Sequence, residues 1–273
     1  MNNFQVRVIS SVVIIIVTLF GLFYNELSFR VLFYLVALGC WWEYSFLTLK
    51  NIFFYRLLGL FICTILYWSW FYYDNIKPAF YLLFFSITVI SLLISEIFFT
   101  SEIPFRRVGF LVLGLFYIVL PFILLNDLTL LNIGNEKVFS PRLVAGLLGL
   151  TWAYDTGAYL IGSRIGKNLL IPRISPKKTW EGTIGGAVVC MLMSFAGIPL
   201  FHIYSNLFWF VISCIVFISG SLGDLIESLL KRSSGVKDSG FLIPGHGGFL
   251  DRFDSFIVVI PFVYLFLVLR NII

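Results

Sequence analysis

Four carboxylates border a polar segment between two long apolar stretches near the end of this 273-residue chain. Asp224 and Glu227 lie at the end of the first stretch, and Asp251 and Asp254 open the second. The spacing of three residues places each pair on one face of a helix. Carboxylates beside hydrocarbon are costly, and four together repel one another unless a cation lies between them. Such oxygen ligands suit Mg²⁺, which commonly binds through one or two carboxylates and substrate phosphates.

An alternative is that neighbouring cations neutralise these carboxylates in buried ion pairs. The cations concerned are Lys231, Arg232 and Arg252. The connecting segment is also rich in glycine, which ion pairs alone would not require, and we therefore favour a metal site. His246 lies between Gly245 and Gly247, where a backbone can approach a ligand closely. We expect His246 either to contact a phosphate or to be a histidine of the turn.

A second polar segment, residues 162–186, supplies five cations, several hydroxyl groups and backbone amides beside glycines. These are the ingredients of a site that binds a polyphosphate. Residues 162–168 resemble a P-loop only superficially, because the spacing is one residue short and Asn replaces Ser or Thr. A plain basic loop would account for the cations but not for Ser175-Pro176 or Glu181-Gly182.

The composition places these polar segments in a membrane protein. Hydrophobic residues make up 60% of the chain, charged residues only 12%, and the mean hydropathy is +0.99. A soluble domain carries about 25% charged residues. The net charge of +5 indicates basic loops beside membrane helices rather than a nucleic-acid surface. The four cysteines occur singly in apolar stretches, and we expect them to be buried and reduced.

Apolar stretches of about 20 residues predict an all-α membrane protein with about nine transmembrane helices. The predicted spans are 6–24, 28–49, 52–73, 78–99, 107–126, 142–163, 183–203, 207–230 and 249–270. We divide the chain into an N-terminal multispan region, 1–140, with about five helices, and a catalytic C-terminal region, 141–273. The C-terminal region carries both polar segments.

Lys and Arg are distributed unequally between the two sides of this predicted bundle. Fourteen lie on the side of the N-terminus and of both polar segments, and five lie on the other side. The positive-inside rule therefore predicts a cytoplasmic N-terminus and an external C-terminus. Glu43, Asp155 and Asp224 then lie roughly 10–14 Å inside the cytoplasmic ends of their helices. Asp251 and Asp254 start the last helix from the same side, and a water-filled pocket open to the cytoplasm would explain all five.

Sequence patterns within residues 150–256 resemble those of phosphatidate cytidylyltransferases, also called CDP-diacylglycerol synthases. The first pattern comprises Asp155-Thr-Gly-Ala-Tyr, Gly166-Lys167 and Ser175-Pro-Lys-Lys-Thr-Trp-Glu-Gly182. The second comprises Gly223-Asp-Leu-Ile-Glu-Ser228, Lys231-Arg232, Lys237-Asp238 and Pro244-Gly-His-Gly-Gly-Phe-Leu-Asp-Arg-Phe-Asp254. The first 140 residues resemble the family only in being multispan.

The resemblance implies transfer of a cytidylyl group from CTP to phosphatidate, which gives CDP-diacylglycerol and pyrophosphate in phospholipid biosynthesis. It implies Mg²⁺ as the cofactor, with a second cation as an option. The implied metal ligands are Asp224 and Asp251, with Glu227 and Asp254 beside them. The candidate catalytic residues are Asp224, Asp251, Lys231, Arg232, His246 and Arg252. The residues expected to bind CTP or phosphate are Asp155, Lys167, Ser175, Lys177, Lys178, Thr179, Glu181, Lys237 and Asp238.

The expected partners are CTP, phosphatidate and membrane lipids, with a homodimer as a possible assembly and no nucleic acid. We expect a multi-pass protein of the cell (inner) membrane, with its active site facing the cytoplasm. The alternative enzyme is a CTP-dependent polyprenol or phytol kinase, which would release CDP instead of pyrophosphate. A cation-coupled transporter would need polar residues in the outer half of its spans, whereas here they cluster in the inner half.

Overall fold

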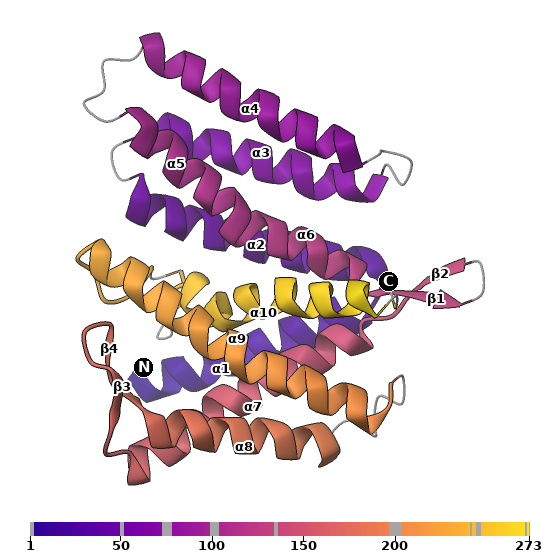
Figure 1. Ribbon diagram of the computed structural model, residues 1–273, viewed down its shortest axis with the longest axis vertical. Helices are drawn as coiled ribbons and strands as arrows, with labels where there is room; N and C mark the ends of the chain where they lie inside the picture. Colours follow the sequence, from indigo (N-terminus) through magenta and orange to yellow (C-terminus); the bar gives the residue numbers. More distant parts are fainter. Residues whose placement is uncertain are drawn as a thin grey trace.

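The computed structural model describes residues 3–49, 52–72, 78–98, 104–133, 136–196, 204–240, 242–243, 247–270 and 272. These residues form a bundle of helices that run roughly side by side (Figure 1). In the N-terminal region the helices are α1 (Asn3–Phe23), α2 (Glu26–Thr48), α3 (Phe53–Tyr72), α4 (Pro78–Phe98), α5 (Pro104–Gly114) and α6 (Leu120–Asp127). A π-helical turn, Leu115–Val119, joins α5 to α6. The C-terminal region contains α7 (Arg142–Ile165), α8 (Trp180–Ala196), α9 (Asn206–Ser233) and α10 (Leu250–Leu269).

Each predicted span corresponds to a helical stretch in the described part of the chain, with α5, the π-helical turn and α6 taken as one rod. Five of these described stretches are long and apolar enough to cross a membrane. They are Glu26–Thr48, Phe53–Trp70, Phe105–Asp127, Asn206–Ser233 and Leu250–Leu269. Parts of α1, α4 and α8 form shorter apolar helices. These helices indicate a multi-pass membrane protein.

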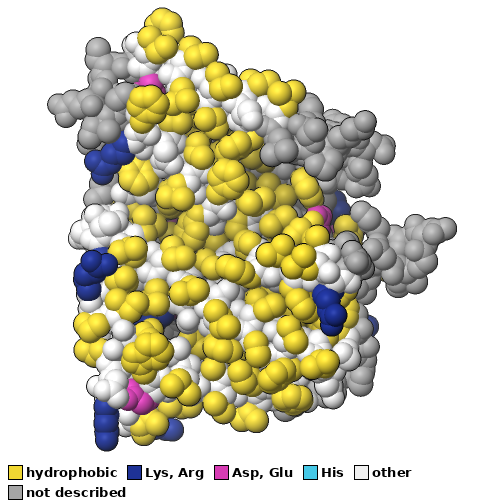
Figure 2. Space-filling view, viewed as in Figure 1, with side chains coloured by type: hydrophobic (Ala, Val, Ile, Leu, Met, Phe, Trp, Pro, Cys, Tyr) yellow, Lys and Arg dark blue, Asp and Glu magenta, His cyan; other side chains and the backbone are white. Residues whose placement is uncertain are grey.

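The outside of the bundle suits contact with hydrocarbon. The face shown in Figure 2 is apolar across its middle, and most of its Lys and Arg side chains lie toward the two ends of the helices. Large apolar side chains on the outside include Ile16 on α1, Leu192 on α8 and Phe262 on α10, each more than half exposed. Lipid can cover such a surface because a helix satisfies its backbone hydrogen bonds internally.

Two short antiparallel hairpins correct the all-α prediction. Strand β1 (Leu130–Ile133) pairs with β2 (Glu136–Phe139), and β3 (Leu169–Ile171) pairs with β4 (Ser175–Thr179). They lie at opposite ends of the bundle, β1–β2 at the end where α10 finishes and β3–β4 at the end where α9 finishes (Figure 1). The sequence did not reveal them because strands of three to five residues are too short for a clear two-residue period.

Glycines bring α8 close to α7, which positions the β3–β4 hairpin that connects the two helices. A Cβ at Gly182 would lie 2.8 Å from the carbonyl oxygen of Ala158, and one at Gly186 would lie 2.8 Å from that of Tyr154. Small residues allow membrane helices to approach to backbone contact. Gly182 and Gly186 belong to the segment predicted to present backbone amides to a phosphate, and they therefore also allow α8 to pack against α7.

A third close approach joins α9 to α10. A Cβ at Gly223 would lie 2.6 Å from the carbonyl oxygen of Asp254 and 2.9 Å from the Cα of Ser255. The absence of a side chain at Gly223 thus brings the next residue, Asp224, beside Asp254. Helix α10 also packs against α6 and α2, so the last helix contacts both regions of the chain.

Candidate active site

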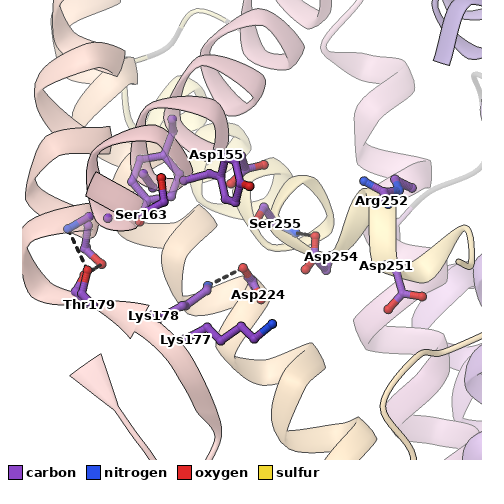
Figure 3. Close-up of a pocket in the computed structure, with 16 residues that line it drawn as sticks. Asp155, Ser163, Lys177, Lys178, Thr179, Asp224, Asp251, Arg252, Asp254 and Ser255 are labelled. Carbon is purple, nitrogen blue, oxygen red and sulfur yellow. Dashed lines mark hydrogen bonds and ion pairs between the residues drawn. The ribbon is translucent and has the colours of Figure 1, made fainter. Parts of the chain in front are cut away.

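A pocket of about 540 Å³ lies between α7, β4, the start of α8, α9 and the start of α10 (Figure 3). This volume is within the range of small-molecule sites. Eight of the residues predicted from the sequence line it. They are Asp155, Lys177, Lys178, Thr179, Asp224, Asp251, Arg252 and Asp254. The two polar segments, which are far apart in the sequence, therefore contribute to one site.

Three carboxylates in and beside the pocket are close enough to share one cation. Asp224, Glu227 and Asp254 each offer an oxygen, and these oxygens lie within 4.8 Å of one another. Asp224 lies between Asp254 and Lys178 (Figure 3) and forms an ion pair with Lys178. Glu227 is fully buried and forms an ion pair with Lys231. Oxygen donors of this kind fit a divalent cation such as Mg²⁺.

Asp251 lines the same pocket but is held by donors of the protein. Its Oδ1 accepts a hydrogen bond from the Lys231 ammonium at 2.7 Å. Its Oδ2 accepts the backbone N–H groups of Ser239 at 3.1 Å and Gly248 at 2.9 Å and lies 2.9 Å from the Ser239 hydroxyl. A carboxylate has about four lone-pair sites, so Oδ1 is the oxygen with capacity for a ligand. These donors therefore hold the Asp251 carboxylate in one orientation at the edge of the pocket.

The β3–β4 hairpin brings two lysines to the pocket. Lys177 and Lys178 lie on β4, and the Thr179 hydroxyl accepts a hydrogen bond from the Gly182 N–H at 3.2 Å. Glu181 holds the other side of the hairpin, where its carboxylate accepts the backbone N–H groups of Lys167 at 3.1 Å and Asn168 at 3.2 Å. Hydrogen bonds from its own backbone N–H and from these two amides lower the pKa of Glu181 to about 2. Glu181 lies ahead of the predicted span 183–203 and anchors the hairpin as a carboxylate.

Several predicted site residues lie outside the lining of this pocket. Lys231 and Glu227 form an ion pair with each other, and Lys231 also pairs with Asp251 of the lining; such ion pairs are the predicted alternative to a metal. The predicted ligands Arg232, Lys167, Ser175, Glu181, Lys237 and Asp238 are not among its lining residues. The guanidinium of Arg232 donates instead to the carbonyl oxygen of Val236 at 3.4 Å. His246 lies outside the described residues.

Other lining residues were not singled out from the sequence. Tyr159 and Ser163 line the pocket with Asp155. Their spacing of four and eight residues from Asp155 places all three on one face of α7, and this period could have indicated them. Ser239, which binds Asp251 but is not among the lining residues, gave no such signal, because its contacts depend on how the connecting segment folds.

Comparisons with known proteins identify the family of this chain. Residues 5–270 match the cytidylyltransferase family. The chain is 36% identical over 283 residues to the phosphatidate cytidylyltransferase of Bacillus subtilis, covering 98% of this chain and 99% of that protein. It is 48% identical over 122 residues to the phosphatidate cytidylyltransferase of Staphylococcus haemolyticus and 46% identical over 121 residues to that of Staphylococcus aureus, covering 44% of this chain and 46% of each relative. The chain belongs to the cytidylyltransferase family.

Proposed function

We propose that this protein transfers the cytidylyl group of CTP to phosphatidate, forming CDP-diacylglycerol and releasing pyrophosphate. The observation that carries the proposal is the pocket in which carboxylates of α9 and α10 lie opposite lysines of β4. Family membership and the match to phosphatidate cytidylyltransferases over nearly the whole chain support it. The kinase and transporter alternatives have no comparable support.

The carboxylates of α9 and α10 fit a Mg²⁺ ion. We assign Asp224, Glu227 and Asp254 to hold it, with Asp251 reaching the site through Oδ1. Lys231 compensates part of the negative charge on this cluster. When bound, Mg²⁺ would neutralise charge on the phosphate oxygens as the transition state forms.

The lysines of β4 have the complementary role of binding phosphate. CTP and phosphatidate are both anions, so their mutual repulsion must be offset before they can react. Lys178 pairs with Asp224 and is the cation we expect to exchange a carboxylate for a phosphate when substrates bind. Lys177, an exposed side chain that lines the same pocket, and Arg252 would add positive charge.

The reaction then requires a displacement at the α-phosphorus of CTP. An oxygen of the phosphatidate phosphate forms a bond to that phosphorus, and the bond from the phosphorus to the β-phosphate oxygen breaks. The electron pair leaves on pyrophosphate. A phosphate monoester with a second pKa of about 6 is already ionised near neutral pH, so no strong general base is required.

We further propose that the nine helical stretches all span the membrane and that the pocket faces the cytoplasm. The acyl chains of phosphatidate would then enter the pocket sideways from the inner leaflet. Tyr159, which lines the pocket and is 73% exposed, supports lateral access. Labelling of Lys177→Cys by a membrane-impermeant thiol reagent should occur in inverted vesicles and not in right-side-out vesicles. Cross-linking in native membranes would test the predicted homodimer.

The test of function is product analysis with the purified protein, CTP, phosphatidate and Mg²⁺. We expect pyrophosphate and CDP-diacylglycerol in equal amounts, and a decrease in kcat of about 10²–10³-fold for Asp224→Asn and Asp254→Asn. Glu26→Gln is the matched control, because this partly exposed carboxylate pairs with Arg30 in the first turns of α2. Release of CDP would identify a kinase instead. Full activity in both Asn variants would remove these carboxylates from the site.

A further inference from the structure

Glu43 is a buried carboxylate that the proposed reaction does not use. It lies on α2 in the N-terminal region, and only 3% of its surface is exposed. The sequence predicted that it would share the water-filled pocket with Asp155 and Asp224, but it is not among the lining residues of that pocket. Since a buried charge is costly unless it is hydrogen-bonded, the partners of Glu43 indicate what it does.

Both oxygens of Glu43 accept hydrogen bonds from the segment that joins α9 to α10. Oε1 accepts the backbone N–H of Phe249 at 3.0 Å. Oε2 accepts the backbone N–H of Leu250 and the hydroxyl of Ser239, each at 2.9 Å. All three donors are about 200 residues away in the sequence, at the border of the candidate active site.

Two of these bonds cap the helix that carries Asp251 and Asp254. The N-cap of α10, Phe249, makes no side-chain capping bond of its own. The first N–H groups of a helix need acceptors, and a negative charge beside them is favourable. Glu43, on α2, supplies the acceptor oxygens and the negative charge, so it fixes where α10 begins.

The third bond connects Glu43 to Asp251. The Ser239 hydroxyl lies 2.9 Å from Glu43 Oε2 and 2.9 Å from Asp251 Oδ2, and its single proton can be donated to one of them at a time. The backbone N–H of Ser239 donates to Asp251 as well, at 3.1 Å. Ser239 therefore lies between the two carboxylates and sets their separation.

The segment is shaped around the Glu43 carboxylate. A Cβ at Gly240 would lie 2.5 Å from Glu43 Oε1, and one at Gly248 would overlap Glu43 Oε2. One turn earlier on α2, a Cβ at Gly39 would lie 2.8 Å from the ring of Phe249. Glycines on both sides of the contact thus allow α2 and the segment to meet closely.

We infer that Glu43 is a positioning residue for the reaction, which holds the Ser239 and α10 backbone so that Asp251 and Asp254 keep their places in the site. This inference rests on the proposed function. It gives the N-terminal region a direct connection to the candidate active site. Partners that orient metal-binding groups typically contribute 10–100-fold to metal affinity or activity.

The test compares Glu43→Gln with Glu96→Gln, a second buried carboxylate of the N-terminal region, which is bonded by Tyr55. Gln keeps the size of Glu43 but replaces one acceptor oxygen by an NH₂ group that faces N–H donors. We expect the Mg²⁺ concentration for half-maximal activity to rise about tenfold in Glu43→Gln and to stay unchanged in Glu96→Gln. A purely structural role would lower the amount of active enzyme without moving this midpoint. An unchanged midpoint in Glu43→Gln overturns the inference.

Two further measurements cover the other outcomes. Should Glu43→Gln fail to fold, Ser239→Ala removes the hydroxyl between Glu43 and Asp251 while keeping the backbone N–H bond to Asp251, and it is expected to raise the midpoint about fivefold or more. An unchanged midpoint in that variant contradicts the inference. Should the wild-type protein make no CDP-diacylglycerol, the proposed function fails, and Mn²⁺ binding followed by electron paramagnetic resonance reports on Glu43 independently. Weaker Mn²⁺ binding in Glu43→Gln than in the wild type would then support the positioning role, and equal binding would refute it.

Discussion

Gly223→Ala should disrupt the active site without changing any group that does chemistry. The added methyl group would lie 2.6 Å from the carbonyl oxygen of Asp254, whereas ordinary contacts begin at about 3.4 Å. Both of the nearest atoms, this oxygen and the Cα of Ser255, belong to the backbone and cannot rotate away. Helices α9 and α10 must therefore separate locally by about 0.8 Å, the difference between the two distances. This movement draws Asp224 away from Asp254.

The size of the effect follows from that displacement. Overpacking a close contact costs about 1–3 kcal/mol, while replacing Gly by Ala within a helix contributes about 1 kcal/mol of stability. The net loss of stability is thus small, on the order of 0–2 kcal/mol. A misplacement of about 1 Å at a reacting centre costs about 10²-fold in rate, so we expect kcat to fall by 10–100-fold.

Gly220→Ala is the matched control for this prediction. Gly220 lies one turn earlier on α9, and its added Cβ would lie 3.6 Å from Val259 and 3.7 Å from Ser255, which are ordinary contacts. Both variants gain the same helix propensity, so the difference between them isolates the collision with α10. The assay is CDP-diacylglycerol formation at saturating CTP and phosphatidate, with thermal inactivation measured in the same detergent. Equal kcat values for the two variants would refute the reasoning.

Three further outcomes are expected. Lys178→Gln should raise the KM for CTP about tenfold or more, because a phosphate-binding cation is lost; an unchanged KM in steady-state kinetics would exclude the exchange of Lys178 from Asp224 to phosphate. Glu181→Gln should lower kcat/KM for CTP by about 3–10-fold, because the hairpin loses a charged acceptor for two backbone amides, and limited proteolysis should then cut the hairpin faster. Removal of divalent cations with a chelator should abolish activity in the wild type, and Mg²⁺ should restore it with a higher midpoint in Asp254→Asn.

The sequence was sufficient to predict the helical stretches and most of the carboxylates that line the candidate site. A stretch of about 20 apolar residues in a membrane has only the helix available to satisfy its backbone. Asp155, Asp224, Asp251 and Asp254 were recognisable because carboxylates rarely lie at the edge of hydrocarbon without a function. Their convergence on one pocket required only that the polar segments lie on the same side of the membrane.

Contacts between distant segments could not be predicted. Glu43 was recognised as an intramembrane carboxylate, but its donors lie about 200 residues away and leave no local pattern. The local ion pair between Lys231 and Glu227, by contrast, has a spacing of four residues and was one of the two arrangements that the sequence left open. The glycines of α8 were ambiguous in the same way, since close packing and phosphate binding both favour glycine.

The most direct test of the proposed site is a structure of the protein with CTP and Mn²⁺, in which anomalous scattering locates the cation. We predict a peak about 2.1 Å from oxygens of Asp224 and Asp254, with the triphosphate between this cation and the lysines of β4. A cation bound away from α9 and α10, or a triphosphate that contacts neither the cation nor Lys178, would contradict the proposed active site.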